Sequence, residues 1–308
     1  MSVDQPIFLA SLDLGSNSFH LLISEWRDGL LREVKRHKDL VQLARAVDDN
    51  GQLDQQAMQR ALASLRHCRQ HLDQYSISHL RVVGTQILRQ CRTPEAFILE
   101  AESILNAPID IISGDEEASL VYQGVAAGLD PASRQGTTLV LDIGGASTEI
   151  ITGKNGDIQD KASLKLGCVT LANRFFTSRV KIERTSVESS QAVAREVFLS
   201  IKPRFTRRPI NLAVGASGTL RVLLDLLQFG SNARLDIGRS QIEHLIDDII
   251  KTQSMSASLD DNLRWDVLPA GIAILSAFFD VFEFESVQVS SHSIKEGMML
   301  DWISHNTP

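Results

Sequence analysis

The sequence predicts an α/β protein built from two related lobes. The prediction rests on a strand–loop–strand unit at residues 139–151 and on a second copy of it at residues 8–23. In each copy an apolar run ends in an aspartate, glycine and hydroxyl residues form a short loop, and apolar residues resume. Asp13 aligns with Asp142 at an offset of 129 residues (142 − 13). With 308 residues, the chain is long enough for two domains with separate cores.

Apolar periodicity and turn residues place the elements of the first half. We expect strands at residues 7–12, 19–25, 30–36, 80–83 and 109–112, and helices at 54–75, after Pro94 and from Ser113 to Val125. Ser113 and Glu116 fit a capping box at the start of the last of these helices. The polar segment 130–136 carries Pro and Gly, so we expect the boundary near residues 125–135, between lobes 1–127 and 128–308.

The second half shows the same mixture of elements. After the hairpin at 139–151 we expect helices at 186–201, 240–253, 269–282 and 294–304, and a strand at 287–289. Ser240 and Glu243 fit a second capping box. The segment 269–282 is strongly apolar, which predicts a buried helix. The sequence does not decide whether the last helix packs back onto the first lobe.

The loops of the two hairpins have the composition of phosphate-binding loops. Their glycines let the backbone approach a ligand closely, and N–H groups with the hydroxyls of Ser147 and Thr148 could surround a phosphate. Beside a polyanion, Asp142 and Glu149 make sense mainly as holders of a divalent cation. For one loop alone, a hairpin with incidental polar residues is the alternative. A third loop at 215–219 also follows a strand, and neither the Rossmann spacing nor a P-loop ending occurs.

Composition excludes several classes of function. The net charge is −7, so no global field attracts a polyanion, and a phosphate chain would have to meet local basic groups. Two basic clusters qualify, each with a solvated charged face as its alternative: Arg32, Lys35, Arg36 and Lys38, and Lys202, Arg204, Arg207 and Arg208. Aromatic residues are sparse around both clusters, so we do not expect a nucleic-acid partner.

Targeting signals and cysteines indicate the compartment. No apolar run reaches the roughly 20 residues that span a membrane, and the N-terminus lacks a signal-peptide pattern, so we expect no membrane partner. Three cysteines without metal-ligand spacing predict free thiols and a cytoplasmic protein, with Cys68 on the apolar face of a helix.

An ordered set of motifs resembles the exopolyphosphatase/guanosine pentaphosphate phosphohydrolase (Ppx/GppA) family, within the larger group that contains actin, hexokinase and sugar kinases. The matching motifs lie at 13–18, 84–89, 112–118, 142–149, 167–169 and 215–219. The resemblance implies two ribonuclease-H-like (actin-like ATPase) lobes, each with a mixed five-stranded sheet flanked by helices, and an interdomain cleft. It also implies that the two hairpin loops meet there around one phosphate tail.

The resemblance assigns roles residue by residue. Glu117 falls on the position of the catalytic base, although acids in a first helical turn are also ordinary helix-start chemistry. Arg89 ends the Gly-Thr-x-x-Leu-Arg motif and would bind phosphate oxygens. Asp142 and Glu149 would hold Mg²⁺ or another divalent cation. The phosphate-binding residues would be Gly15, Ser16, Asn17, Ser18, Gly144, Gly145, Ala146, Ser147, Thr148, Gly215, Ser217, Gly218 and Thr219.

Some positions depart from the family pattern. Ser291 and His292 replace an acid and a glycine, Lys295 replaces an arginine, and Ala146 replaces a third glycine. A histidine that fills a loop is favoured over a new functional group at His292. Longer members of the family carry an additional helical C-terminal region; we expect a chain of two lobes without that region to act on short polyphosphate or a nucleotide rather than on long polymers.

The implied function is hydrolysis of terminal phosphoanhydride bonds, with polyphosphate or guanosine pentaphosphate as the small-molecule substrate. A homodimer is left open. Two alternatives remain: a catalytically weak sensor that binds an alarmone or polyphosphate, and an ATP-dependent phosphotransferase.

Overall fold

The chain folds into two compact units. The computed structural model describes residues 6–45, 47, 51–92, 94–177, 181–227, 235–253 and 266–306. The first unit contains the described residues up to Gly124 and those from Ile294 onward, and the second runs from Val125 to Ser293. The division falls inside helix α4 (Gly114–Gly128), whereas the sequence placed it after residue 127. The last helix therefore groups with the first unit.

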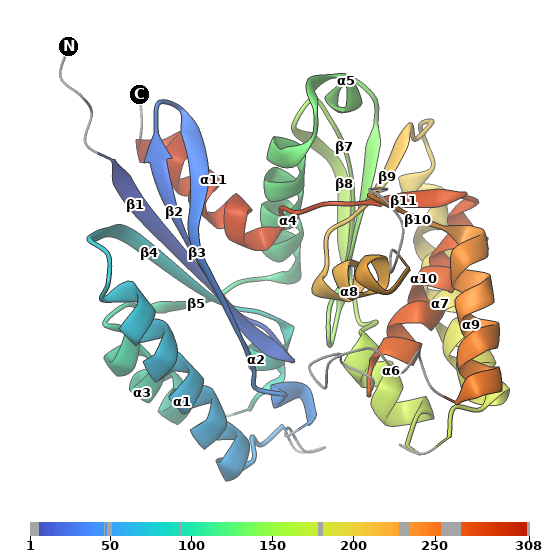
Figure 1. The fold of residues 1–308 in the computed structure, drawn as a ribbon, viewed down its shortest axis with the longest axis horizontal. Helices are drawn as coiled ribbons and strands as arrows, with labels where there is room; N and C mark the ends of the chain where they lie inside the picture. The colour runs from blue at the N-terminus through green and yellow to red at the C-terminus, as the bar shows by residue number, and fades with distance from the viewer. Residues whose placement is uncertain are drawn as a thin grey trace. The chain divides into compact units, whose positions relative to one another are not determined.

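The first unit has a five-stranded sheet in the order β3-β2-β1-β4-β5 (Figure 1). Its elements are β1 (Ile7–Leu14), β2 (Ser18–Arg27), β3 (Leu30–Leu40), the 3₁₀ turn η1 (Leu43–Arg45), α1 (Gln55–Leu72), β4 (Ile77–Gly84), α2 (Gln86–Gln90), α3 (Glu95–Leu105), β5 (Ile109–Ile111), α4, and α11 (Ile294–Asn306). Strand β2 pairs antiparallel with β1 and β3, whereas β4 pairs parallel with β1 and with β5.

Apolar residues of the first sheet alternate between two buried faces, as a strand period of two requires. Leu12 and Leu14 of β1 belong to a core that includes residues of α1 and α3, where Cys68 is buried as predicted. Leu9 points to the other face and packs with Met299 of α11. Asp13 shares the parity of Leu9, so its side chain leaves the sheet on the α11 side.

The second unit has a six-stranded sheet in the order β10-β11-β9-β6-β7-β8. Its elements are α5 (Pro131–Arg134), β6 (Thr138–Ile143), β7 (Thr148–Lys154), β8 (Asp157–Leu164), α6 (Cys168–Phe175), α7 (Arg184–Phe205), β9 (Leu212–Gly215), α8 (Gly218–Leu227), β10 (Asp236–Gly238), α9 (Arg239–Thr252), α10 (Leu268–Phe282) and β11 (Ser286–Val289). The sixth strand, β10, pairs antiparallel with β11. It is three residues long, which is too short to show an alternation of apolar and polar residues in the sequence.

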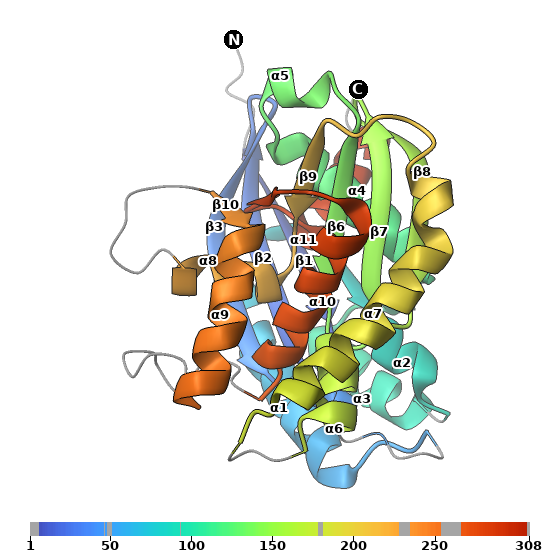
Figure 2. The ribbon, with the colours of Figure 1, turned by 90° about the vertical axis from the view of Figure 1, so that its right-hand side faces the viewer.

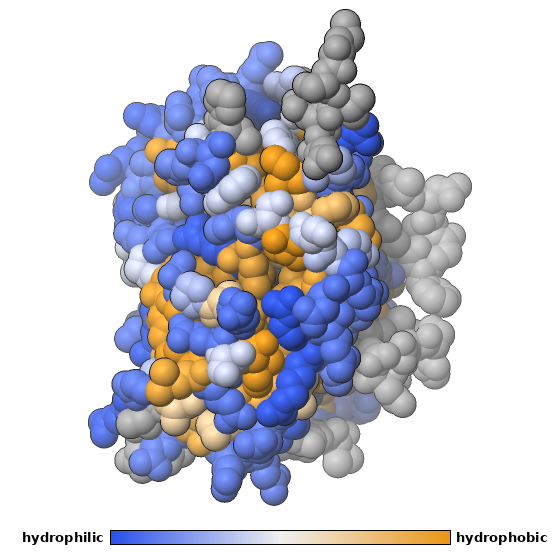
Figure 3. Space-filling model, turned by 90° about the vertical axis from the view of Figure 1, so that its left-hand side faces the viewer, coloured by the Kyte–Doolittle hydropathy of each residue, from blue (hydrophilic) through white to orange (hydrophobic). Residues whose placement is uncertain are grey.

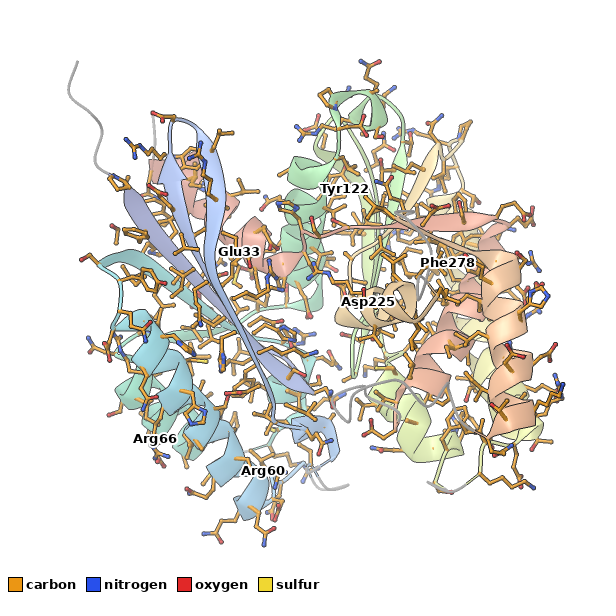
Figure 4. All side chains as sticks on the ribbon, viewed as in Figure 1. Glu33, Arg60, Arg66, Tyr122, Asp225 and Phe278 are labelled. Carbon is orange, nitrogen blue, oxygen red and sulfur yellow. The ribbon has the colours of Figure 1, made fainter. Side chains whose placement is uncertain are left out.

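Helices α7, α9 and α10 lie across one face of this second sheet (Figure 2). Almost every residue of α10 is buried, which confirms the predicted buried helix. Phe278 (labelled in Figure 4) packs edge-on against Phe198 of α7, with ring centroids 5.9 Å apart. Such aromatic pairs add about 0.5–1.5 kcal/mol to the hydrophobic gain. The core of this unit is therefore built around α10.

One predicted helix cap forms and the other does not. The Ser113 hydroxyl accepts a hydrogen bond from the Glu116 N–H at 3.1 Å, which is the N-cap half of the predicted capping box, whereas the Glu116 carboxylate pairs with Arg81. The box at Ser240 and Glu243 was wrong, because α9 begins two residues earlier than a Ser240 cap allows. There the Gln241 side chain accepts from the Gly238 N–H at 2.8 Å, and Glu243 pairs with Arg239.

A histidine cluster lies between β3 and α1 in the first unit. The rings of His37 and His71 have centroids 4.6 Å apart, and His37 Nε2 lies 3.1 Å from a carboxylate oxygen of Asp39. Burial, followed by the charges of His37 and Lys35, lowers the pKa of His71. Protonation of His71 therefore opposes folding.

The surface of the first unit carries scattered exposed apolar side chains. Leu30, Leu40 and Leu99 are each more than half exposed. Figure 3 shows one face of the molecule, on which orange apolar surface is bordered by blue polar surface. Single exposed leucines are ordinary on protein surfaces. In the described part of the chain, no helix combines the length and apolar character needed to cross a membrane.

Candidate active site

The parallel strands of the first sheet end at one edge, and polar loops follow them there. Leu14, Gly84 and Ile111 are successive register partners at the ends of β1, β4 and β5. The loop after β1, helix α2 and helix α4 therefore start from the same edge. In α/β sheets this carboxyl edge is where ligands bind.

The loop of the first hairpin, Gly15–Asn17, turns sharply before β2 begins at Ser18. A Cβ on Gly15 would lie 2.8 Å from the Ser18 carbonyl oxygen, so the turn requires glycine. The N–H of Val41 donates to the Asn17 carbonyl at 3.0 Å, which ties the loop to the segment after β3. The Ser18 hydroxyl is buried and has no hydrogen-bond partner among the described residues. A buried hydroxyl of this kind suits a ligand oxygen.

The loop of the second hairpin repeats this geometry. A Cβ on Gly144 would lie 2.9 Å from the Ser147 carbonyl oxygen, and the Gly144 N–H donates to that oxygen at 2.9 Å. The N–H groups of Cys168 and Val169, in the first turn of α6, donate to the Gly144 and Gly145 carbonyls at 3.0 and 2.8 Å. Helix α6 therefore holds the carbonyl side of the loop. The backbone φ of Ala146 is not positive, so an alanine at this position causes no backbone strain of the kind that only glycine avoids.

Gly167 fits against this second loop. A Cβ on Gly167 would lie 2.2 Å from the Gly145 carbonyl oxygen and 2.5 Å from the Ala146 carbonyl carbon. Only glycine allows this approach, which explains a motif whose role the sequence did not reveal.

The two candidate metal ligands lie opposite each other on neighbouring strands. Asp142 of β6 and Glu149 of β7 are antiparallel register partners, so their side chains project from the same face. The Ser293 hydroxyl donates to Asp142 Oδ2 at 2.9 Å, and the Ser163 hydroxyl donates to Glu149 Oε1 at 2.6 Å. Asp142 is half-buried and Glu149 is buried. The sequence did not single out Ser163 or Ser293, because neither lies in a glycine-rich motif.

Arg89 and Glu117 form an ion pair in the first unit. Arg89 Nη2 donates to Glu117 Oε2 at 3.0 Å, and a second donor of Arg89 bonds the Ile112 carbonyl. The Gln86 side chain accepts from the same guanidinium at 2.7 Å. Glu117 is buried, whereas the neighbouring Glu116 is exposed and pairs with Arg81. The two adjacent acids therefore differ in environment, and their roles in catalysis and capping stay predictions.

The third loop supports the second one from the neighbouring strand. The Thr219 hydroxyl donates to the Ile143 carbonyl at 3.0 Å, and the Ser217 hydroxyl accepts from the Leu220 N–H at 3.0 Å. A Cβ on Gly215 would lie 2.2 Å from a Leu220 methyl carbon. These contacts are structural, and phosphate binding by residues 215–219 stays a prediction.

Comparison with known proteins identifies the family. The model of the "Ppx/GppA phosphatase family" matches residues 22–306. The chain belongs to this family. A guanosine-5'-triphosphate,3'-diphosphate pyrophosphatase of Vibrio vulnificus is 33% identical over 312 residues, and one of Aliivibrio fischeri is 33% identical over 313. Each alignment covers 98% of this chain but only 60% or 61% of the relative. The chain thus spans about three fifths of the length of these relatives.

Solved structures of Ppx/GppA proteins confirm the predicted two-lobed actin-like fold. An exopolyphosphatase from Cytophaga hutchinsonii superposes with a TM-score of 0.87 at 22% identity, covering 97% of this chain and 98% of that chain. The Aquifex aeolicus member of the Ppx/GppA family gives a TM-score of 0.79 at 22% identity, covering 99% and 100%.

The departures from the Ppx/GppA pattern have a structural explanation in part. His292 packs beside Gly128, where an added Cβ would lie 2.6 Å from His292 Nδ1, and the Ser291 hydroxyl lies 3.0 Å from the same nitrogen. His292 therefore fills its loop, as the sequence favoured. Lys295 is buried in the first turn of α11, next to Glu296, which is paired with Arg36 at 2.9 Å.

The carboxylates fit a hard divalent cation. Asp142 and Glu149 offer oxygen ligands from one face of the sheet, beside the glycine loop. Among the described residues, no group of three or more His, Cys, Asp or Glu side chains is placed to hold a metal ion. A Mg²⁺ at this position would therefore need phosphate oxygens and water as its remaining ligands, which is how Mg²⁺ commonly binds beside phosphates.

Proposed function

We propose that this protein hydrolyses the terminal phosphoanhydride bond of inorganic polyphosphate or of guanosine pentaphosphate. The relatives named guanosine-5'-triphosphate,3'-diphosphate pyrophosphatase and the structural neighbour named exopolyphosphatase support both substrates. The two share the same terminal chemistry. The observation that carries the proposal is the buried Glu117, held by Arg89 at the sheet edge from which the first glycine loop also starts.

In this mechanism Glu117 acts on the attacking water. Its carboxylate accepts a proton as the water oxygen bonds to the terminal phosphorus, and the bridging P–O bond breaks with its electron pair on the leaving phosphate. Arg89 orients Glu117 through one N–H, and three further N–H groups bond Gln86 and the Ile112 carbonyl, which leaves one Nη1 N–H for a phosphate oxygen. The hairpin loops bind phosphates through backbone N–H groups and the hydroxyls of Ser18 and Ser147. That both loops grip one phosphate tail stays a prediction.

The proposed mechanism also includes a divalent cation. Asp142 and Glu149 would hold it, with Ser293 and Ser163 orienting their carboxylates. When bound, such a cation neutralises charge on phosphate oxygens. Mg²⁺ is the ion that we propose, because it combines carboxylates with phosphate oxygens and water.

The decisive experiment substitutes Glu117 and its neighbour in parallel. Glu117→Gln keeps the shape and removes the base, so phosphate release should fall by about 10²–10⁴-fold while substrate binding is retained. Glu116→Gln is the matched control, because Glu116 is adjacent and exposed; it should keep nearly full activity. Release from tripolyphosphate, long polyphosphate and guanosine pentaphosphate, measured side by side with Mg²⁺, ranks the substrates. Unchanged hydrolysis in Glu117→Gln would rule out the assigned base.

A further inference from the structure

The second unit carries a pocket of about 240 Å³ that the proposed mechanism does not use. Its lining includes three arginines, one aspartate and two threonines: Arg204, Arg207, Arg208, Asp160, Thr137 and Thr152. The pocket is smaller than the roughly 300–1,000 Å³ typical of sites for drug-sized ligands, so it suits a small polar group.

The pocket lies at the edge of the sheet opposite to the glycine loops. Thr137 immediately precedes β6, whereas the second loop follows Ile143 at the other end of the same strand. Thr138 pairs with Gly153 across the antiparallel ladder, so Thr152 belongs to the same edge as Thr137. At about 3.3 Å per residue, the five steps from Thr138 to Ile143 along β6 separate the two edges by roughly 17 Å. This pocket is therefore separate from the glycine loops of its own unit.

The basic residues around the pocket differ in how they are engaged. Arg204 is fixed by Asp160, with Nε to Oδ1 at 2.6 Å, and by the Lys161 carbonyl at 2.7 Å. Arg207 and Arg208 follow the end of α7, are exposed, and make no hydrogen bond or ion pair with any described residue. Three arginines against one carboxylate leave the pocket with a net charge of about +2. An uncompensated positive pocket of this kind attracts an anion.

Hydroxyl groups form the buried part of the pocket. Thr137 and Thr152 are 7% and 4% exposed, and no described residue hydrogen-bonds to either side chain. The arginine fork is matched to phosphate oxygens, and threonine hydroxyls donate to the same atoms. The donors thus come from both the rim and the interior of one pocket.

We propose that this pocket binds an oligophosphate group, through Arg207 and Arg208 with Thr137 and Thr152, at a site separate from the glycine loops. Free tripolyphosphate and the phosphate groups of a nucleotide present the same chemistry to it. The pocket's small volume admits the phosphates and leaves a nucleoside outside. The inference does not rest on the proposed hydrolysis, because none of these residues takes part in it.

The test is calorimetric titration of the full chain with tripolyphosphate in magnesium-free buffer containing chelator. Arg207→Ala/Arg208→Ala should lose one binding site, or bind there at least tenfold more weakly, which corresponds to about 1.4 kcal/mol. The control is Arg60→Ala/Arg66→Ala on α1, which removes the same charge from the other unit and should bind as the wild type does. Figure 4 shows Arg60 and Arg66 projecting outward from α1.

Separate readouts distinguish this site from the glycine loops. If the loops also bind tripolyphosphate, the number of sites falls from two to one in the pocket variant; if they do not, it falls from one to none. Hydrogen exchange in the wild type should show tripolyphosphate protection of residues 204–211, and Arg207→Gln/Arg208→Gln should abolish that protection. Titration with GTP in place of tripolyphosphate reports whether a nucleotide also serves as the source. Equal numbers of sites and equal affinity in the wild type and the pocket variants would overturn the proposal.

Discussion

Gly167→Ala tests whether the second glycine loop is held in place by packing rather than by its own sequence. The added Cβ would lie 2.2 Å from the Gly145 carbonyl oxygen, whereas ordinary contacts begin at 3.4 Å. Atoms must therefore move by about 1 Å, and the nearest ones are backbone atoms of the loop, which cannot rotate away. Overpacking of this kind costs about 1–3 kcal/mol. For a unit of this size the melting temperature should fall by about 2–12 °C.

The same shift should reach the chemistry. A displacement of about 1 Å in a positioning loop can cost about 10²-fold in rate, so phosphate release should fall further than the loss of folded protein explains. Thermal unfolding by circular dichroism and phosphate release at 25 °C separate the two effects. Gly218→Ala is the control for stability, because a Cβ there has no neighbour within 4 Å. Wild-type melting and phosphate release in Gly167→Ala would refute the packing argument.

Three further predictions concern other contacts. Ser293→Ala removes the hydroxyl that donates to Asp142, so the Mg²⁺ concentration for half-maximal phosphate release should rise about tenfold; an unchanged Mg²⁺ titration contradicts the orienting role. Arg36→Met removes a guanidinium from the buried carboxylate of Glu296 and should lower the free energy of unfolding by about 1–3 kcal/mol. Urea unfolding of a double-mutant cycle with Glu296→Gln should show coupling between the two positions. Additive effects of the two substitutions would exclude a stabilising ion pair. Burial lowers the pKa of His71 below 6.5, so the folded state binds fewer protons than the unfolded state and loses stability as the pH falls through about 6.5. His71→Gln should therefore flatten the melting temperature between pH 7.5 and 5.5, and a slope equal to that of the wild type would contradict this assignment.

Local patterns in the sequence predicted much of the fold. The duplicated hairpins, the buried helix α10 and the Ser113 cap follow from apolar periodicity and turn chemistry within a few residues, and such interactions leave a signal in one stretch of chain. Strand β10 and the observed N-cap of α9 have no such signal in the sequence. The three residues of β10 are too few to show a period, and the N-cap of α9 is Gly238, which has no capping side chain.

The chain's order of residues also determined which polar groups sit at the strand ends, and hence the family and the candidate loops. Only the tertiary structure decided their partners: Arg89 with Glu117, Ser293 with Asp142, and Gly167 against the Gly145 carbonyl. These pairs join residues up to 151 positions apart. Their contact depends on strand register and on the direction of side chains across a sheet, which no single stretch of sequence encodes. The arginine pocket has the same origin, since its walls come from strand ends and a helix end that meet only in the folded unit.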